Sequence, residues 1–418
     1  MTSLTEVYSL FLASSGVQTD SRQLKKNQLF FALKGPSFDG NLYAEKVILA
    51  GAYAAVVDDP LVAAANESCY LVDDVLYTLQ ELAQHHRNQF KIPVVALTGS
   101  NGKTTTKELT SAVLNTQHTV LATSGNLNNH IGVPLTLLEI NKNHRLAIIE
   151  MGANNLGEIA HLCTIAQPTH GLITNVGKAH LEGFGSEAGV LKGKTELYRF
   201  LAQANGTVFV NKEDETLVNA LPDTLSIYYT PTAFVVIEHH PTLSLRYNAI
   251  EFNTQLAGAY NVANIAAAIS IGMTFEVPLQ KCIKAIEAYS PSNHRSQVLE
   301  KNNKTIVLDA YNANPTSMSA AVQAFSKRTG EKAVILGTMA ELGVHEVKEH
   351  EILVNAVKSL GINRCYWVGN PYKALVAENW FSSVENLKDH FKKYPLEIAQ
   401  VLIKGSRSVS LEHLLEVL

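Results

Sequence analysis

The stretch that decides the fold is VVALTGSNGKTTTKELTSAVL, residues 94–114, in which a glycine-rich turn separates two regular segments. The standard phosphate loop has Gly, four residues, and then Gly-Lys-Ser/Thr. Counting back from Gly102 in that pattern gives position 97, where Leu97 stands, and Gly99 comes two residues too late. The turn is therefore either a phosphate loop of another class or a chance cluster of glycines between a strand and a helix.

The segments on either side favour a phosphate loop. VVAL is typical of a buried strand and KTTTKELTSAVL of a helix, so the order is strand, turn and helix. In this setting backbone N–H groups at the helix N-terminus can hold phosphate. Gly99 and Gly102 let the backbone approach closely. Lys103 can then lie against the β- and γ-phosphates, and the hydroxyl of Thr104 is placed to bind Mg²⁺.

The composition indicates a protein of several domains. At about 150 residues per domain, the 418 residues predict two or three domains. Hydrophobic residues make up 46%, and 34 basic against 38 acidic side chains give a net charge of −4. A nucleic-acid-binding protein needs a basic surface, which this balance does not provide.

The N-terminus lacks a basic start followed by an apolar run, so we expect no signal peptide. No apolar run reaches the roughly 18 residues that span a membrane. The four cysteines are widely spaced, without a CxxC pair, which is typical of a reducing compartment. We expect a cytoplasmic protein with no membrane segment and no nucleic-acid partner, and a monomer as the default.

Apolar segments typical of strands alternate with helical segments along most of the chain. Beyond the mixed strands and helices of the first ninety residues, the expected strands are 91–97, 145–152, 170–177, 206–211, 304–311, 332–339, 364–370 and 399–406. A helix is expected from 188 to 200, and the stretch 290–300 is polar and typical of a loop. Such alternation predicts an α/β fold with parallel sheets covered on both faces.

We therefore predict an α/β protein of three domains. Residues 1–90 form a small α/β N-terminal domain, residues 91–293 a central P-loop parallel-sheet ATPase domain, and residues 294–418 a Rossmann-like C-terminal α/β domain. The strands of the last domain end in Gly, Asp or Asn, where ligands gather at the carboxyl ends of parallel strands.

TGSNGKTTT resembles the ATP loop of the Mur ligases and the folylpolyglutamate synthases, which form amide bonds and share this shortened spacing. Further motifs resemble the same family in order along nearly the whole chain: GNLNNHIGVPLTLL (125–138), IEMGANNLGEI (149–159), ITNVGKAHLEGFGS (173–186), GAYNVANIAAAI (258–269), DAYNANPTSM (309–318), LGTMAELG (336–343) and IKGSR (403–407). YNANPTSM and LGTMAELG resemble the branch that joins D-alanyl-D-alanine to UDP-N-acetylmuramoyl-tripeptide.

The N-terminal segments TDSR (19–22) and FFALKGPSFDGN (30–41) resemble the nucleotide-sugar domain of that branch. Asn41 stands where the branch usually has His, and Tyr260 stands before Asn261 where His is common. These two departures bear on fine substrate contacts and leave the class unchanged.

The resemblance implies an ATP-dependent ligase of peptidoglycan precursor synthesis that needs Mg²⁺. A carboxylate does not condense with an amine in neutral water, because its oxygen is a poor leaving group. Transfer of the γ-phosphoryl group of ATP gives an acyl phosphate that the amine can attack, with ADP and phosphate as products. Lys103 and the divalent cation would neutralise the negative charges that meet in this step. The implied substrates are UDP-muramoyl-tripeptide and D-alanyl-D-alanine.

The resemblance implies Thr104, Glu150, His180 and Lys194 as metal ligands, and the last three together with Lys103 as the catalytic set. Glu150 ends a predicted strand, and His180 would bind a second metal as neutral imidazole. The family has a lysine at the place of Lys194 that reacts with CO₂ to give a carbamate, which removes a cation and supplies two oxygens. Lys192 competes for this role, since a helix turns the two side chains about 200° apart and only one can face the site. The plain alternatives are a strand-end acid, a structural histidine and a surface lysine.

The resemblance divides the remaining candidate residues by ligand. ATP would contact Thr98, Gly99, Ser100, Asn101, Gly102, Lys103, Thr104, Thr105, Asn261, Asn264, Arg295 and Asp309. Because the last two belong to the third domain, ATP would bridge two domains and close them. The substrates would contact Ser21, Arg22, Thr123, Ser124, Asn128 and Asn129, and on the dipeptide side Asn312, Asn314, Lys404 and Arg407.

Other functions remain open. A P-loop kinase or NTPase motor shares the loop but predicts neither AHLEGFGS nor YNANPTSM. A non-catalytic ATP-binding protein descended from such ligases would not need the whole catalytic set. Within the family, the nearest alternatives are the branch that adds the third amino acid and folylpolyglutamate synthase.

Overall fold

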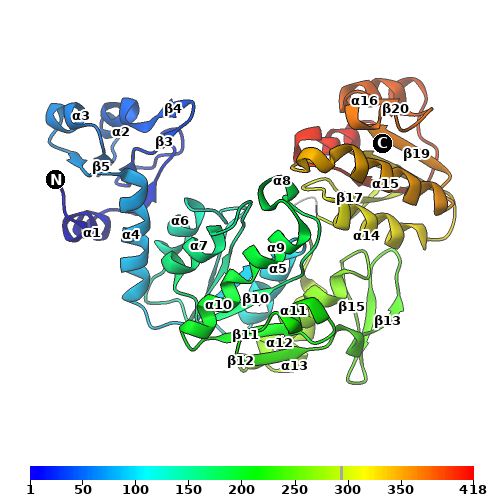
Figure 1. Cartoon of the computed structure of the whole chain (residues 1–418), viewed down its shortest axis with the longest axis horizontal. Helices are drawn as coiled ribbons and strands as arrows, with labels where there is room; N and C mark the ends of the chain where they lie inside the picture. Colours follow the sequence, from blue (N-terminus) through cyan, green and yellow to red (C-terminus); the bar gives the residue numbers. More distant parts are fainter. Residues whose placement is uncertain (292–294) are drawn as a thin grey trace.

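The computed structural model describes residues 1–291 and 295–418, which form three α/β domains (Figure 1). The N-terminal and C-terminal domains lie at opposite ends of the central domain. The predicted fold class is confirmed. The predicted boundary between residues 293 and 294 lies outside the described residues.

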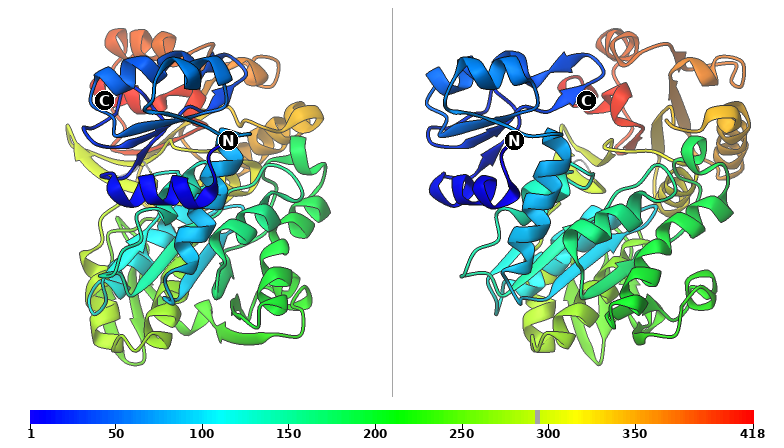
Figure 2. Two further views of the ribbon diagram at one scale, coloured as in Figure 1. Left: turned by 90° about the vertical axis from the view of Figure 1, so that its left-hand side faces the viewer. Right: turned by 60° about the vertical axis from the view of Figure 1, so that its left-hand side comes forward.

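The N-terminal domain is built on a parallel sheet of order β1-β2-β5-β6. Its elements are α1 (Leu4–Ala13), β1 (Val17–Gln18), β2 (Leu29–Phe31), the hairpin β3 (Lys34–Gly35) and β4 (Phe38–Asp39), α2 (Ala44–Leu49), β5 (Ala54–Val57), α3 (Pro60–Ala65) and β6 (Cys69–Leu71). Helix α4 (Val75–Asn88) leads to the central domain and contacts α1 as well as α6 and α7 (Figure 2). The buried guanidinium of Arg87 donates to the carbonyl oxygen of Ala166 at 3.2 Å, which fastens α4 to the central domain.

The central domain contains a parallel sheet of order β12-β11-β10-β7-β9-β8. Its strands are β7 (Val94–Thr98), β8 (Val120–Ala122), β9 (Leu146–Glu150), β10 (His170–Ile173), β11 (Thr207–Asn211) and β12 (Leu225–Tyr229). Helices α5 (Lys103–Leu114), α12 (Asn261–Thr274) and α13 (Leu279–Ala288) cover one face, and α6 (Gly132–Leu137), α7 (Glu158–Ala166) and α10 (Glu196–Gln203) cover the other. Shorter helices are α8 (Leu181–Phe184), α9 (Glu187–Lys194) and α11 (Glu215–Asn219).

The buried strands β7 and β9 explain why this sheet forms. Every residue of both strands is buried, and alternate side chains enter the cores on opposite faces. Each buried Val, Leu or Ile stabilises the fold by about 1.5–3 kcal/mol. The register sets Leu97 beside Glu150 and Thr98 beside Ile173. The glycine-rich turn, Glu150 and the residues after β10 therefore meet at one edge of the sheet.

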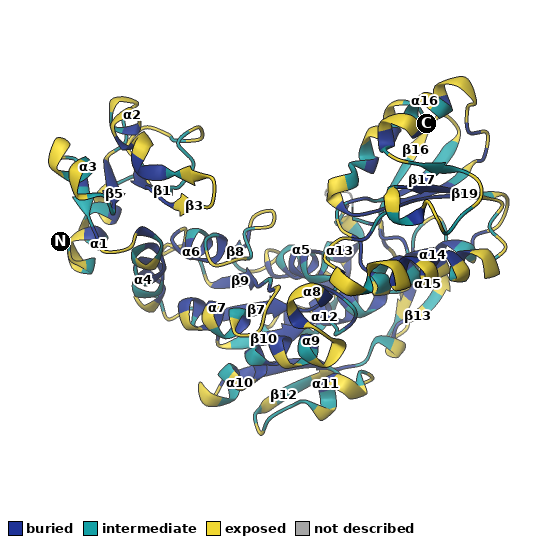
Figure 3. Ribbon diagram, turned by 45° about the horizontal axis from the view of Figure 1, so that its top comes forward, coloured by how far each residue is buried: buried dark blue, intermediate teal, exposed yellow. Residues whose placement is uncertain are grey.

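The C-terminal domain contains a sheet of order β16-β17-β21-β18-β19-β20. Strand β16 (Gln297–Lys301) is antiparallel to β17 (Lys304–Asp309), while β21 (Gln400–Lys404), β18 (Lys332–Gly337), β19 (Arg364–Val368) and β20 (Trp380–Phe381) continue in parallel. The helices are α14 (Pro315–Ser326), α15 (Glu346–Ser359) and α16 (Val384–Lys393). Buried strands run through the middle of this domain and of the central domain, with exposed residues on the outer helices (Figure 3).

Two features of the central domain differ from the prediction. The helix expected from 188 to 200 is two helices, α9 and α10, which meet at Thr195. The hydroxyl of Thr195 donates to the carbonyl oxygen of Leu191 at 2.8 Å, beside the helical bond that its own N–H makes to the same oxygen at 2.9 Å. The unpredicted strands β13 (Val235–Glu238), β14 (Ser244–Tyr247) and β15 (Ile250–Asn253) form a small antiparallel sheet.

Across the described ranges, the structure contains no helix with the length and apolar character needed to cross a lipid bilayer.

Candidate active site

The glycine-rich turn between β7 and α5 needs both of its glycines. Gly99 and Gly102 have φ angles of +142° and +79°, which side chains other than glycine rarely adopt. A Cβ atom on Gly102 would lie 2.6 Å from Oδ1 of Asn264, and one on Gly99 would overlap the hydroxyl of Thr174. The turn is therefore fixed against α12 on one side and the end of β10 on the other.

Polar contacts hold the turn in shape. The hydroxyl of Thr174 donates to the carbonyl oxygen of Asn101 at 2.6 Å, and the backbone N–H of Asn101 donates to Oδ1 of Asn175 at 3.0 Å. Helix α5 begins directly after the turn at Lys103. Its N-terminus therefore presents free N–H groups and a partial positive charge, as a phosphate site requires.

Lys103 lies at the start of α5, and its Nζ donates to the carbonyl oxygen of Gly99 at 2.6 Å. Removal from solvent lowers the pKa of Lys103, and the nearby Glu150 carboxylate partly offsets this effect. The side chain of Lys103 thus bends back, so that its ammonium contacts the glycine-rich turn.

Glu150, at the end of β9, gathers polar side chains from three segments. Its Oε1 accepts from Thr104 Oγ1 at 3.2 Å and from Asn128 Nδ2 at 2.8 Å. Its Oε2 is buried without a hydrogen-bond partner among the described residues and lies 3.9 Å from Nζ of Lys107. Lys107 is buried and also donates to the carbonyl oxygen of Gly125 at 3.3 Å.

The chemistry of this cluster fits a hard divalent cation. Mg²⁺ prefers carboxylate and hydroxyl oxygens and keeps several waters, so it needs few protein ligands. Glu150 supplies an unpartnered buried carboxylate oxygen, and Thr104 an adjacent hydroxyl. Within residues 1–291 and 295–418, no group of three or more His, Cys, Asp and Glu side chains is arranged to hold a metal, so any ion here would rely on water and substrate oxygens as well.

His180 lies just before α8 and contacts the C-terminal domain. Its Nδ1 is 2.5 Å from Oε2 of Glu341, a residue in the loop after β18. The His180 interaction, together with the charge of Lys103, holds the pKa of Glu341 below its usual range. His180 and Glu341 both have left-handed backbone angles, with φ of +52° and +61°.

Lys194, rather than Lys192, points into the protein. Lys194 is fully buried near the end of α9, its Nζ donates to the carbonyl oxygen of Ala153 at 3.2 Å, and it lies 5.2 Å from the ring centre of Phe184. Burial, helped by the charge of Lys103, holds the pKa of Lys194 well below its ordinary value. Lys192 is exposed.

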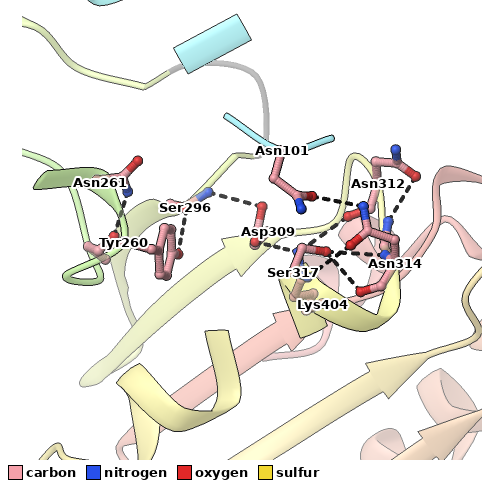
Figure 4. Close-up of polar contacts among 11 residues, drawn as sticks. Asn101, Tyr260, Asn261, Ser296, Asp309, Asn312, Asn314, Ser317 and Lys404 are labelled. Atoms are coloured by element: carbon pink, nitrogen blue, oxygen red, sulfur yellow. Dashed lines mark hydrogen bonds and ion pairs between the residues drawn. The ribbon is translucent and has the colours of Figure 1, made fainter. Parts of the chain in front are cut away.

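In the C-terminal domain, Asp309 and Lys404 form an ion pair, with Nζ 2.6 Å from Oδ2 (Figure 4). Lys404 Nζ also lies 3.3 Å from the carbonyl oxygen of Asn312. The guanidinium of Arg295 stacks 3.7 Å from the ring centre of Tyr311, and its Nε is buried without a hydrogen-bond partner in the part of the chain that the structure describes.

One hydrogen bond connects the turn to the C-terminal domain. Asn314 Nδ2 donates to Oδ1 of Asn101 at 2.8 Å, as Figure 4 shows. In the same view Asn261, on α12, bonds back to its own domain, where its Nδ2 donates to the carbonyl oxygen of Ala257. Asn264 donates to Oδ1 of Asn261 and accepts from the hydroxyl of Thr106.

A cavity of about 530 Å³ between the central and C-terminal domains brings most of the predicted site residues together. Its lining includes Ser100, Asn101, Gly102, Lys103, Thr104, Thr105, Asn128, Asn129, Glu150, His180, Asn261, Asn264, Arg295, Asp309, Asn312 and Lys404. The cavity thus faces the turn, the Glu150 cluster and the Asp309–Lys404 pair at once.

The other predicted residues lie outside that lining. Thr98, Gly99, Thr123 and Lys194 are buried behind it, while Ser124 and Arg407 are exposed. Asn314 is held by Asn101, and Ser21 and Arg22 belong to the distant N-terminal domain, where Arg22 pairs with Asp20. Thr123 accepts a hydrogen bond from the backbone N–H of Glu150 at 2.9 Å, so its hydroxyl supports the strand end.

Sequence reasoning missed three residues of this region. Lys107 follows Lys103 by one helical turn, a spacing that places both on the same side of α5. Glu341 belongs to LGTMAELG and Tyr311 to DAYNANPTSM, so both stood in recognised motifs without an assigned role. Only the contact of Glu341 with His180 and of Tyr311 with Arg295 reveals their part in the site.

The sequence matches three family models along its length. These are "Mur ligase family, catalytic domain" at residues 14–87, "Mur ligase middle domain" at 97–272, and "Mur ligase, glutamate ligase domain" at 294–406.

Individual proteins are similar over nearly the full chain. UDP-N-acetylmuramoyl-tripeptide–D-alanyl-D-alanine ligase of Escherichia coli is 34% identical, with 99% of this chain and 95% of that protein covered. The crystal structure of MurF from Acinetobacter baumannii is 30% identical with a TM-score of 0.86, covering 97% of both chains. MurF ligase from Thermotoga maritima, solved in complex with ADP, is 27% identical with a TM-score of 0.85, again covering 97% of both chains.

Proposed function

The chain belongs to the Mur ligase family, and from this premise we propose how its residues join D-alanyl-D-alanine to UDP-N-acetylmuramoyl-tripeptide. It is an ATP-dependent ligase of peptidoglycan precursor synthesis, with ADP and phosphate as products. The observation that supports the residue assignments is the cavity in which the turn, the Glu150 cluster and the Asp309–Lys404 pair face one another.

The first step is phosphoryl transfer from ATP to the free carboxylate of the tripeptide. The bond between the γ-phosphorus and ADP breaks while a bond to the carboxylate oxygen forms, which gives an acyl phosphate. The N-terminus of α5 and Lys103 would bind the β- and γ-phosphates and neutralise their charge. Lys103 would leave the carbonyl oxygen of Gly99 to do so.

The second step is attack by the amine of D-alanyl-D-alanine on the acyl carbon. Phosphate leaves with the electrons of the broken C–O bond, and the nitrogen loses a proton as the amide forms. An acyl phosphate must be kept from water, which the cavity between two domains favours.

Mg²⁺ would be held by Glu150 and Thr104, with His180 and a carbamate on Lys194 serving a second ion. A bound divalent cation draws negative charge from the phosphate oxygens. Two observations support these ligands: Oε2 of Glu150 is buried without a hydrogen-bond partner among the described residues, and Glu341 lies against the Nδ1 edge of the His180 ring.

The environment of Lys194 favours its carbamylation. Only an uncharged amine attacks CO₂, and burial lowers the pKa of Lys194 so that the neutral form becomes accessible. The carbamate carries a negative charge where the ammonium carried a positive one. Because Nζ of Lys194 contacts Ala153, which lines the cavity, the carbamate oxygens would be close to a cation bound there.

The remaining contacts are assigned by ligand. Asn261, Asn264, Arg295 and Asp309 would hold the nucleotide, and Ser21, Arg22, Ser124, Asn128 and Asn129 the muramoyl peptide. The dipeptide would lie near Asn312, Asn314, Lys404 and Arg407. The monomeric state and the cytoplasmic location expected from the sequence stay predictions.

The deciding experiment incubates the purified chain with ATP, Mg²⁺ and UDP-muramoyl-tripeptide carrying either lysine or diaminopimelate. Phosphate release should require D-alanyl-D-alanine, and neither a free diamino acid nor glutamate should replace it. Phosphate release with glutamate as the acceptor would instead favour folylpolyglutamate synthase. Phosphate release with the diamino acid as the acceptor would favour the branch that adds the third amino acid.

Hydroxylamine tests the activated intermediate. It should trap the acyl phosphate as a hydroxamate when ATP and the muramoyl peptide are present without dipeptide. Steady ATP hydrolysis that needs no acceptor and yields no hydroxamate would contradict the two-step reaction.

A further inference from the structure

A close contact between a ring nitrogen and a carboxylate joins the site histidine to the C-terminal domain. Glu341 Oε2 lies 2.5 Å from Nδ1 of His180, and the backbone N–H of Glu182 donates to the carbonyl oxygen of Glu341 at 3.2 Å. Two successive contacts therefore fix the loop after β18 against the start of α8. Both Glu341 and the Lys103 side chain line the same cavity.

The backbone at both ends of this pair is unusual. His180 and Glu341 adopt left-handed φ angles of +52° and +61°, a region that non-glycine residues seldom occupy. Such angles persist only where the surrounding structure enforces them, and they concentrate at functional sites. One residue on each side of the domain boundary therefore has an unfavourable backbone angle, and the side chains of these two residues, His180 and Glu341, are in contact.

The loop that carries Glu341 rests on a rigid base. The backbone N–H of Met339 donates to Nε2 of the fully buried His350 at 3.1 Å, and Tyr372 Oη donates to the carbonyl oxygen of Gly337 at 3.0 Å. On the far side, a Cβ on Gly343 would lie 3.3 Å from Cβ of Glu182. The C-terminal domain thus fixes the backbone of the loop from which the Glu341 side chain extends to His180.

The contact determines what the imidazole can do. A carboxylate at Nδ1 selects the tautomer with its proton on that nitrogen, which leaves the lone pair of Nε2 available. Metal-binding histidines commonly donate their second ring nitrogen to a carboxylate, which orients the ring and makes it a stronger ligand.

We propose that Glu341 is a positioning residue that orients His180 for a divalent cation, so that the C-terminal domain completes a metal ligand of the central domain. This inference rests on the proposed role of His180 as a metal ligand. It adds that docking of the domain that holds Asp309 and Arg295 also sets the imidazole. Nucleotide and metal binding would therefore depend on the same domain contact.

A second ion pair across the same boundary provides a matched control. Lys178 Nζ lies 2.7 Å from Oε1 of Glu349, in a pair that does not include His180. Glu349→Ala removes an interdomain contact and keeps the contact between Glu341 and the imidazole of His180. Lys178 is about a third exposed, so its ammonium can return to water.

The test measures cation binding directly in the full-length chain. Mn²⁺, an EPR-visible divalent ion, is titrated in the presence of ADP into the wild type, Glu341→Ala, Glu341→Gln, Glu349→Ala, His180→Ala and the His180→Ala/Glu341→Ala double variant. Circular dichroism checks that each variant folds. Steady-state kinetics then give the Mg²⁺ dependence and the KM for ATP.

Glu341→Ala should weaken Mn²⁺ binding at the affected site by about 10- to 100-fold. The Mg²⁺ concentration needed for half-maximal activity should rise by a similar factor, and kcat should recover at saturating Mg²⁺. Glu341→Gln should recover part of the affinity, because its amide oxygen can accept from Nδ1–H. Glu349→Ala should leave the metal affinity unchanged, and the double variant should bind as weakly as His180→Ala alone.

Four outcomes would overturn the inference. Equal losses in Glu341→Ala and Glu349→Ala would reduce Glu341 to a docking contact. A further loss in the double variant would make Glu341 a direct ligand. If His180→Ala bound Mn²⁺ normally, the role proposed above for His180 would fail first, whereas a normal Glu341→Ala beside a weakened His180→Ala would refute this inference alone.

Discussion

Lys404 and Asp309 stand side by side at the carboxyl ends of the paired strands β21 and β17, and their side chains form a buried ion pair of 2.6 Å. The sequence assigns the two residues to different ligands, Asp309 to the nucleotide and Lys404 to the dipeptide. In the structure, however, Asp309 and Lys404 bind each other. A substitution at one is therefore expected to act through both.

Lys404→Met should destabilise the C-terminal domain and weaken nucleotide binding. The side chain of Lys404 is only 2% exposed, so its loss leaves a largely buried carboxylate without its partner, which costs about 3–5 kcal/mol. Urea denaturation measures the stability change. Kinetics should show a raised KM for ATP, through Asp309, and a raised KM for D-alanyl-D-alanine, which is proposed to lie near Lys404 itself.

Lys388→Met is the control, since it breaks the surface pair with Glu416 and should leave both KM values unchanged with a smaller loss of stability. An unchanged KM for the dipeptide in Lys404→Met would remove Lys404 from that substrate site, and an unchanged KM for ATP would show that the ion pair with Asp309 does not affect nucleotide binding.

Gly102→Ala should abolish productive ATP binding. The new Cβ would meet Asn264 Oδ1 at 2.6 Å, and the φ angle of +79° disfavours any side chain, so the turn must shift. We expect a rise in the KM for ATP of at least tenfold, equivalent to about 1.4 kcal/mol.

Gly330→Ala separates the clash from backbone strain. Gly330 has a similar φ of +82°, and apart from its chain neighbours no atom of the described residues would lie within 4 Å of a Cβ placed there. The substitution should cost about 1–2 kcal/mol of folding stability and leave the kinetics unchanged. Equal kinetic effects in the two variants would contradict the role of the Asn264 contact.

Lys194→Ala should lower turnover by at least about 10- to 100-fold, because it removes the proposed carbamate oxygens. Degassing the wild type at low pH should reduce activity, and added bicarbonate should restore it, whereas bicarbonate should not rescue Lys194→Ala. The exposed Lys192 is the natural comparison, and Lys192→Ala should keep wild-type turnover. Mass spectrometry of gently handled protein should show the CO₂ adduct on one peptide. Full activity in Lys194→Ala would remove the carbamate from the mechanism.

His350 should make the fold sensitive to acid. Burial lowers its pKa from the ordinary 6.5, against a smaller opposite effect of the hydrogen bond to Glu346 and of the acids Glu346 and Glu349. Its Nε2 accepts from the N–H of Met339, so protonation there would place two donors face to face.

The consequence for stability follows from the direction of the shift. The unfolded chain binds a proton below pH 6.5 while folded His350 stays neutral, so its contribution is complete above that pH and falls as pH decreases. The slope is at most about 1.4 kcal/mol per pH unit. His350→Gln keeps one acceptor and one donor without titrating, so the difference between the two melting curves from about pH 8 to about pH 5.5 isolates this residue. Parallel curves would exclude it as the sensitive group.

Local sequence patterns were sufficient to predict the parallel strands that build the site. Strands such as Val94–Thr98 and Leu146–Glu150 are continuous apolar runs, and the helix after Lys103 begins where the turn ends. Periodicity could not predict the antiparallel strand β16 or the sheet β13–β15, because pairing direction depends on partners distant in sequence. No hydrophobic pattern marks the division of the predicted helix into α9 and α10 at Thr195.

The site itself divides in the same way. Lys103, Thr104 and Glu150 follow from the turn and from strand ends, and the structure places them around one cavity. Lys107 beside Glu150 and Glu341 beside His180 required the tertiary fold, since no local spacing links residue 341 to residue 180. The resemblance selected Lys194 over Lys192, and the structure adds that Lys194 is buried while Lys192 is exposed.

Lys107 has a consequence for how this protein depends on its surroundings. Its Nζ, one turn beyond Lys103, lies 3.9 Å from Oε2 of Glu150 and provides a basic group beside that carboxylate. If Mg²⁺ binds at Glu150 as proposed, this carboxylate would still have a basic neighbour in the absence of the ion, so removal of magnesium should lower turnover without unfolding the protein. With a neutral residue at position 107, Glu150 would lack this basic neighbour, and both the stability of the fold and turnover would then depend on the ion.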